Sequence, residues 1–122
     1  MADPLAVERV DFINVPTRDT KRAFAWYHEV LGLPLDENNP DELRAGQVTV
    51  TFWEPENEGF EFKPDVGGFA VRVADVEAAK AELEARGVEC VGSGDTGVCN
   101  MAVVLDPDGN AVILHRRYAA YE

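Results

Sequence analysis

The sequence predicts an α+β fold built from two tandem strand–helix–strand–strand–strand (βαβββ) modules. Together the modules should form a curved mixed sheet with helices outside and a ligand trough inside. Three observations lead there. A pattern of strand, aspartate, helix and glycine occurs twice, and strand-like segments follow each occurrence. The 122 residues suffice for one domain with one core and not for two independent domains.

Each expected helix begins after an aspartate and ends at a glycine. Asp19 and Asp75 are 75 − 19 = 56 positions apart, and Gly32 and Gly87 are 87 − 32 = 55 positions apart. A short carboxylate accepts hydrogen bonds from the free N–H groups of a first helical turn, and glycine adopts the left-handed conformation that ends a helix. Both segments also carry an apolar stripe at helical spacing, which a sheet would cover.

Apolar and alternating segments predict the strands. They are residues 10–15, 33–37, a short piece near 43, then 47–53, 69–73, 88–91, 98–105 and 111–116. The last two are joined by Asp106-Pro107-Asp108-Gly109-Asn110, a strong turn sequence. We therefore place a first module at about residues 8–54, an acidic connector at about 55–66 and a second module at about 67–117, all within one domain of residues 1–122.

One glycine-rich segment imitates a nucleotide-binding motif. Residues 92–97 read G-x-G-x-x-G, but a dinucleotide site needs a helix directly after the glycines. A valine-rich strand is expected there instead. We expect the glycines to form a flexible loop at the mouth of the trough.

The chain is strongly acidic, with a formal net charge of −12. This excludes a nucleic-acid binder, whose affinity depends on Lys and Arg contacts to phosphates, and disfavours an anionic membrane surface. No apolar run approaches the roughly 20 residues of a membrane span, and the N-terminus does not read as a signal peptide, so we expect a cytoplasmic protein. The acidity is explained by solubility or, alternatively, by attraction of a cationic ligand.

Two motifs carry a resemblance to a known family. They are Tyr27 leading into Leu31-Gly32-Leu33, and the turn at residues 106–110. With them, the chain resembles the vicinal oxygen chelate superfamily of glyoxalases, bleomycin resistance proteins and extradiol dioxygenases over about residues 10–116. The resemblance implies the two-module fold, a small-molecule ligand in the trough and a homodimer.

The resemblance also implies where the metal ligands of the family's enzymes would lie. Three of the four positions carried over fall on Phe12, Gly68 and Ile113, and the fourth falls on Thr49, Val50 or Glu54. Phe, Gly and Ile offer neither imidazole nitrogen nor carboxylate oxygen, the donors that divalent ions need. We therefore expect no metal, no cofactor and no catalytic residue.

The resemblance places Phe12, Gly68 and Ile113 on the trough, and strand alternation then extends this set to the other residues expected to contact a ligand, because residues two apart share one face. The candidates are Phe12, Asn14, Phe52, Trp53, Arg72, Ile113 and His115, with Phe52 or Trp53 depending on the phase of its strand. Phe12 and Ile113 could instead fill the core, Arg72 could pair with a carboxylate, and His115 could be a structural surface residue.

These residues predict a metal-free binding protein that sequesters a small, partly aromatic ligand such as an antibiotic, with a cationic ligand as the variant that the acidity favours. The alternative is a lyase, isomerase or dioxygenase of the same fold that uses a divalent metal or acid–base residues. A third interpretation is an interaction module whose trough is filled by its own side chains. Metal content would separate the first two interpretations.

Overall fold

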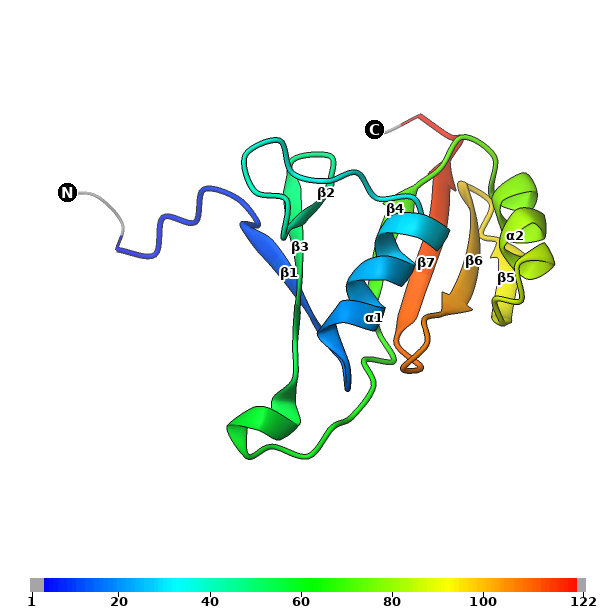
Figure 1. The fold of residues 1–122 in the computed structure, drawn as a ribbon. Helices are drawn as coiled ribbons and strands as arrows, with labels where there is room; N and C mark the ends of the chain where they lie inside the picture. Colours follow the sequence, from blue (N-terminus) through cyan, green and yellow to red (C-terminus); the bar gives the residue numbers. More distant parts are fainter. Residues whose placement is uncertain (1–3, 121–122) are drawn as a thin grey trace.

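The computed structural model describes residues 4–120. It confirms the α+β class, with two open mixed sheets and a helix in each half of the chain (Figure 1). None of the helices in the described part of the chain is long and apolar enough to cross a membrane.

The first half follows the predicted order except for one missing strand. Its elements are β1 (Phe12–Pro16), α1 (Thr20–Ala25), a π-helical turn (Trp26–Val30), β2 (Leu43–Ala45) and β3 (Val48–Trp53). Asp19 caps α1 as predicted, because its side chain accepts hydrogen bonds from the backbone N–H groups of Lys21 and Arg22. Gly32 then follows with a φ of 87°, the left-handed conformation expected at the end of a helix.

The predicted strand at residues 33–37 is wrong. The segment makes a single bridge, between Leu35 and Leu43, and is otherwise irregular. Two side chains turn the chain here: the Asp36 carboxylate accepts from the Asn38 N–H at 2.8 Å, and the Asn39 amide oxygen accepts from the Asp41 N–H at 3.0 Å. Such local side-chain bonds compete with a sheet ladder.

The second half contains β4 (Phe69–Arg72), α2 (Val76–Ala85), β5 (Cys90–Asp95), β6 (Cys99–Leu105) and β7 (Ala111–Arg117). Asp75 caps α2 by accepting from the Ala78 N–H at 3.0 Å. The expected glycine loop is wrong. Gly92 and Gly94 lie inside β5 and pair with Val103 and Met101 of β6 after a bulge at the start of the strand. Turn signals at both glycines were overridden by pairing with the neighbouring strand.

The two sheets have related topologies. Their strand orders are β1–β3–β2 and β4–β7–β6–β5. In each sheet the first strand lies at an edge and pairs in parallel with the last strand of its own half. Within one chain the curved sheet is thus divided into two sheets that are not hydrogen-bonded to each other, and β1 and β4 each have an open edge.

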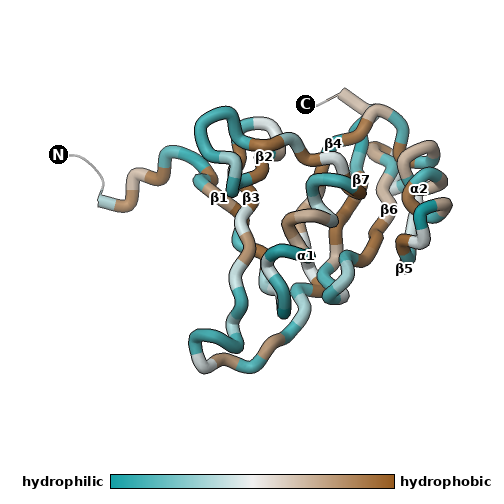
Figure 2. The backbone as a smooth tube through the Cα atoms, viewed as in Figure 1, coloured by the Kyte–Doolittle hydropathy of each residue, from teal (hydrophilic) through white to brown (hydrophobic). Residues whose placement is uncertain are grey.

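One apolar core joins the two halves. It lies on the sheet faces turned toward the helices, which we call the inner faces, and Figure 2 shows apolar residues along β6 and β7 and polar residues over much of α2. The core residues of the two halves are Val15, Tyr27, Leu33, Leu43, Val50, Val76, Leu83, Ala102, Val104, Val112 and Leu114. The shared core satisfies the expectation that neither half has enough apolar surface of its own.

The connector swings away from both sheets before it returns to β4 (Figure 1). It begins with a 3₁₀ turn, Pro55–Glu58. Phe62 is buried and lies under Arg18, whose Cζ is 4.4 Å from the centre of the ring. Phe60 and Val66 remain exposed at 63% and 85%.

Candidate functional site

Each sheet has a face turned away from the helices, and these outer faces carry most of the predicted ligand contacts. The first outer face consists of Phe12, Asn14, Thr49, Thr51 and Trp53. The second outer face includes Ala70, Arg72, Met101, Val103, Ile113 and His115, and it continues to Cys99 and Arg117. The alternation of buried and accessible residues along each strand fixes this assignment.

The first outer face exposes an aromatic ring beside free polar groups. Phe12 is 55% exposed and pairs with Thr49 across the two parallel strands. The Thr51 hydroxyl lies 3.1 Å from the amide oxygen of Asn14 and donates to it. In the described part of the chain, the amide nitrogen of Asn14 has no acceptor, so its two N–H donors are available. A shallow hollow of about 360 Å³ adjoins Phe12, Thr49 and Thr51.

The phase of β3 separates the two aromatic candidates. Trp53 is level with Pro16 on the first outer face. Phe52 lies on the inner face, where its ring is 5.0 Å from that of Tyr27 and 6.4 Å from that of Phe24. Trp53 also contacts the exposed connector residue Phe60, with ring centres 6.3 Å apart. Trp53 therefore shares a face with Phe12, and Phe52 does not.

The second outer face brings a cation and an imidazole together. Arg72 and His115 are partners across the parallel pair of β4 and β7, and Met101 continues the same row in β6. Arg72 is exposed, and no carboxylate of the described residues pairs with it. Ile113 lies in the next row beside Ala70. Arg72, Ile113 and His115 thus share one face of the sheet.

The positions where the resemblance places metal ligands do not fit a metal ion. Thr49, rather than the buried Val50, shares the outer face with Phe12. Gly68 has a φ of 64°, and a Cβ built on it would lie 2.0 Å from the backbone oxygen of Ala111, so no side chain fits there. Across residues 4–120, no group of three or more His, Cys, Asp and Glu is arranged to hold a metal. The side chains at these positions therefore lack the donors that a metal-dependent reaction would need.

A buried polar cluster, which the turn sequence alone did not reveal, ties β1 and α1 to the turn before β7. The Tyr27 hydroxyl donates to the Asp106 carboxylate at 2.8 Å, and the Asn110 amide donates to Asp106 and to the Pro16 carbonyl, both at 2.8 Å. Burial raises the pKa of the Tyr27 phenol well above its usual range, and the charge of Asp106 adds to the increase. These groups are saturated by one another, which indicates a structural role rather than a catalytic one.

The same turn makes a second set of contacts closer to solvent. The Asp108 carboxylate accepts from the Thr17 hydroxyl and from Arg22, whose nitrogen is 2.6 Å away. The turn sequence predicted at residues 106–110 therefore does more than reverse the chain. Both of its aspartates also bind side chains of the first half. The presence of two carboxylates in one turn was the sequence signal for these contacts, since such carboxylates can bind side chains as well as shape the backbone.

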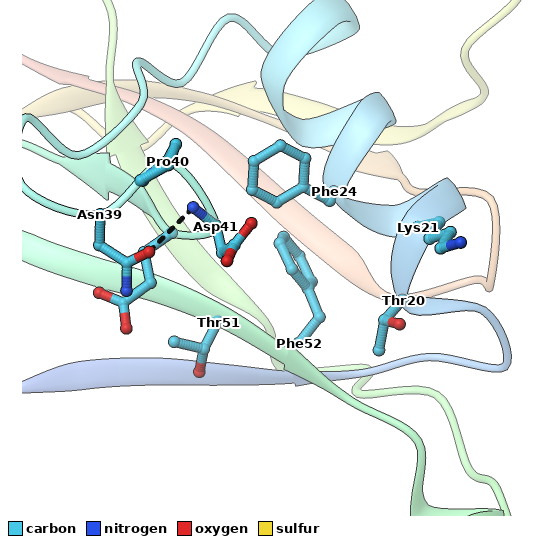
Figure 3. A pocket seen from close by; sticks show the side chains of 9 residues that line it. Thr20, Lys21, Phe24, Asn39, Pro40, Asp41, Thr51 and Phe52 are labelled. Atoms are coloured by element: carbon cyan, nitrogen blue, oxygen red, sulfur yellow. Dashed lines mark hydrogen bonds between the residues drawn. The ribbon is translucent and has the colours of Figure 1, made fainter.

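A further hollow of about 540 Å³ lies on the helix side, between α1, the loop before β2 and the end of β3 (Figure 3). Phe24 and Phe52 form its apolar wall, with ring planes at 76° to each other. Asp41 and Lys21 stand at its rim with opposite charges. This hollow shares Thr51 with the first outer face but contains neither Phe12 nor any residue of the second outer face.

A known protein family matches most of the chain. The family model described as "Glyoxalase/Bleomycin resistance protein/Dioxygenase superfamily" matches residues 9–114. The comparison with curated proteins gives no match.

Solved structures of several relatives have the same fold. TnmS3, described as an antibiotic binding protein from Streptomyces sp. CB03234, is 25% identical with a TM-score of 0.73, over 93% of this chain and 98% of that one. A superfamily member from Sphaerobacter thermophilus DSM 20745 is 21% identical with a TM-score of 0.74, over 91% and 98%. A lactoylglutathione lyase from Agrobacterium tumefaciens is 19% identical with a TM-score of 0.69, over 93% and 94%. With two helix-backed sheets that share one core and a family match over nearly its whole length, the chain belongs to the Glyoxalase/Bleomycin resistance protein/Dioxygenase superfamily.

Proposed function

We propose that this protein is a metal-free binding protein that sequesters a small, partly aromatic ligand, for example an antibiotic. The observation that carries the proposal is Phe12. This ring stands 55% exposed on a sheet face, at the position where the resemblance would place a metal ligand, beside the free amide of Asn14. An exposed aromatic ring next to unsatisfied donors is suited to stacking on a planar ligand and fixing its orientation.

The donor set favours binding over metal-assisted catalysis. A lyase, isomerase or dioxygenase of this fold would need several nitrogen or carboxylate donors around one ion. Gly68 and Ile113 supply none, and Gly68 has no room for a replacement. TnmS3, at 25% identity, is described as an antibiotic binding protein, and this description supports sequestration as the function here.

A second copy of the chain would complete the trough. The two outer faces belong to separate sheets, and β1 and β4 each have an open edge. Unpaired edges recruit further strands. Val10, next to β1, is also exposed, at 63%. We propose a homodimer in which the first outer face of one copy and the second outer face of the other enclose one ligand, giving two sites per dimer.

We expect this binding to occur in the cytoplasm. Cys90 and Cys99 are both free thiols, the state that a reducing compartment maintains.

The proposal is tested by metal analysis and by ligand binding on the same preparation. Untagged protein is dialysed against Mn, Fe, Ni and Zn and its metal content is measured. It is then screened by thermal shift against planar aromatic antibiotics. We expect no stoichiometric metal and at least one ligand that raises the unfolding temperature. Phe12→Ala should weaken that ligand about tenfold, while Val66→Ala, which removes an exposed apolar side chain from the connector, should not. A tightly held stoichiometric ion would contradict the proposal.

A further inference from the structure

We infer, on the basis of the proposed function, that the ligand is an aromatic anion whose carboxylate or phenolate oxygen binds Arg72 and His115. The net charge of the chain had favoured a cationic ligand. The distribution of charge over the outer faces favours the opposite, and it also gives the ligand a direction in the trough.

Arg72 differs from most basic side chains of the chain because it lacks a partner. Five of the others form ion pairs: Arg9–Asp11, Arg22–Asp108, Arg44–Asp36, Lys80–Glu84 and Arg86–Glu82. Arg18 lies over the ring of Phe62. With 23 acidic residues against 11 basic ones, an arginine near a carboxylate is the common situation. Within residues 4–120, the side chain of Arg72 forms no hydrogen bond or ion pair.

The surroundings of Arg72 suit an anion on an apolar floor. Its row on the sheet continues through His115 and Met101 to Gly94, and a Cβ at Gly94 would meet open space. Neighbouring strands lie about 4.8 Å apart, so one oxygen can reach both Arg72 and His115. No residue of the second outer face is acidic. An Arg fork binds carboxylate oxygens with two parallel hydrogen bonds, and such bonds strengthen where water is excluded.

The first outer face supplies further donors and sets the orientation. The amide nitrogen of Asn14 and the indole N–H of Trp53 have no acceptor among the described residues, and an indole N–H can only donate. Carboxylates border this face at Asp11 and Glu42. They would repel an anionic oxygen, so the charged end of the ligand belongs at Arg72 and its aromatic end on Phe12.

The overall charge of −12 does not decide against an anion. At physiological ionic strength the Debye length is about 8 Å, so exposed charges farther away are largely screened. A contact with Arg72 at hydrogen-bond distance is not. The contact between Arg72 and the anionic oxygen therefore determines the affinity, and the net charge of the protein mainly slows the approach of the ligand.

Three ligands with the same aromatic ring system and similar size test the inference: anthracenecarboxylate, anthracenemethanol and anthracenemethylammonium. Each is titrated into the intact protein and followed by its fluorescence. We expect the carboxylate to bind at least tenfold more tightly than the cation, in accordance with the strength of charged hydrogen bonds. Arg72→Gln should weaken the carboxylate about tenfold and leave the alcohol unchanged. Arg116→Gln is the matched control, since it removes the same charge from the opposite face of β7.

The outcomes separate the inference from the proposed function. Equal or tighter binding of the cation, or equal losses in the two arginine variants, overturns the anionic ligand and leaves sequestration of an aromatic ligand standing. Binding of none of the three overturns both. A preference for the carboxylate that disappears in Arg72→Gln and persists in Arg116→Gln supports both.

Discussion

The tightest backbone approach at the site predicts that no side chain can be introduced at Gly68. Gly68→Ala places a Cβ 2.0 Å from the Ala111 oxygen, whereas real Cβ contacts essentially never fall below 3.0 Å, so the strands must part by about 3.0 − 2.0 = 1.0 Å. The positive φ adds roughly 1–2 kcal/mol for any L-residue, and overpacking adds roughly 1–3 kcal/mol. We expect a loss of about 2–5 kcal/mol in the free energy of unfolding.

Gly87→Ala is the control for this experiment. Gly87 has a comparable φ of 86°, but a Cβ there meets nothing within 4 Å, so only the backbone strain of roughly 1–2 kcal/mol applies. Urea unfolding of both variants at one protein concentration measures the difference, because any self-association also shifts stability. Equal losses in the two variants would refute the close approach, and with it the argument that this position cannot carry a metal ligand.

Three further predictions follow from contacts described above. Tyr27→Phe removes a buried donor to Asp106 and should lower the free energy of unfolding by roughly 1.5–3 kcal/mol, measured in urea; a change under about 0.5 kcal/mol would contradict the structural role of the pair. Sedimentation velocity should give a dimer, and Val10→Asp, which puts a charge beside the edge of β1, should shift it toward monomer. Hydrogen bonds from the Tyr118 hydroxyl and a backbone N–H lower the pKa of Asp95. The Tyr118–Asp95 pair therefore stabilises the fold above the ordinary Asp pKa, and this stabilisation is lost as pH falls through the lowered pKa. Tyr118→Phe should raise the Asp95 pKa in an NMR titration, and an unchanged pKa would argue against the bond.

The sequence predicted the helices of this protein better than its strands. Asp19 and Asp75 act through local hydrogen bonds, and a local signal is readable from sequence. The strand expected at residues 33–37 failed because Asp36 and Asn39 bend the backbone, and the loop expected at Gly92 failed because pairing with β6 overrode the local preference of glycine.

In the candidate site, too, local patterns predict some features and long-range pairing decides the others. Alternation within each strand, started from the positions Gly68 and Ile113 that the resemblance gives, predicts that Arg72 and His115 share one face, because both lie in regular strands. It could not choose between Phe52 and Trp53, since the phase of β3 depends on its pairing with β1. The bond from Tyr27 to Asp106 connects residues 79 positions apart, and no local pattern reveals such a contact.

The long sequence separation between the partners in the buried polar cluster determines how the protein unfolds. The Tyr27–Asp106 bond spans 79 positions and the Asn110–Pro16 bond spans 94, so nearly the whole chain must be ordered before the buried polar cluster can form. Closing loops of this length carries an entropic cost of about 4 kcal/mol and slows folding. Neither half should therefore persist alone, and cleavage within the connector should release fragments that must reassociate to regain structure. A ligand held by either sheet would then protect the entire chain in one cooperative transition.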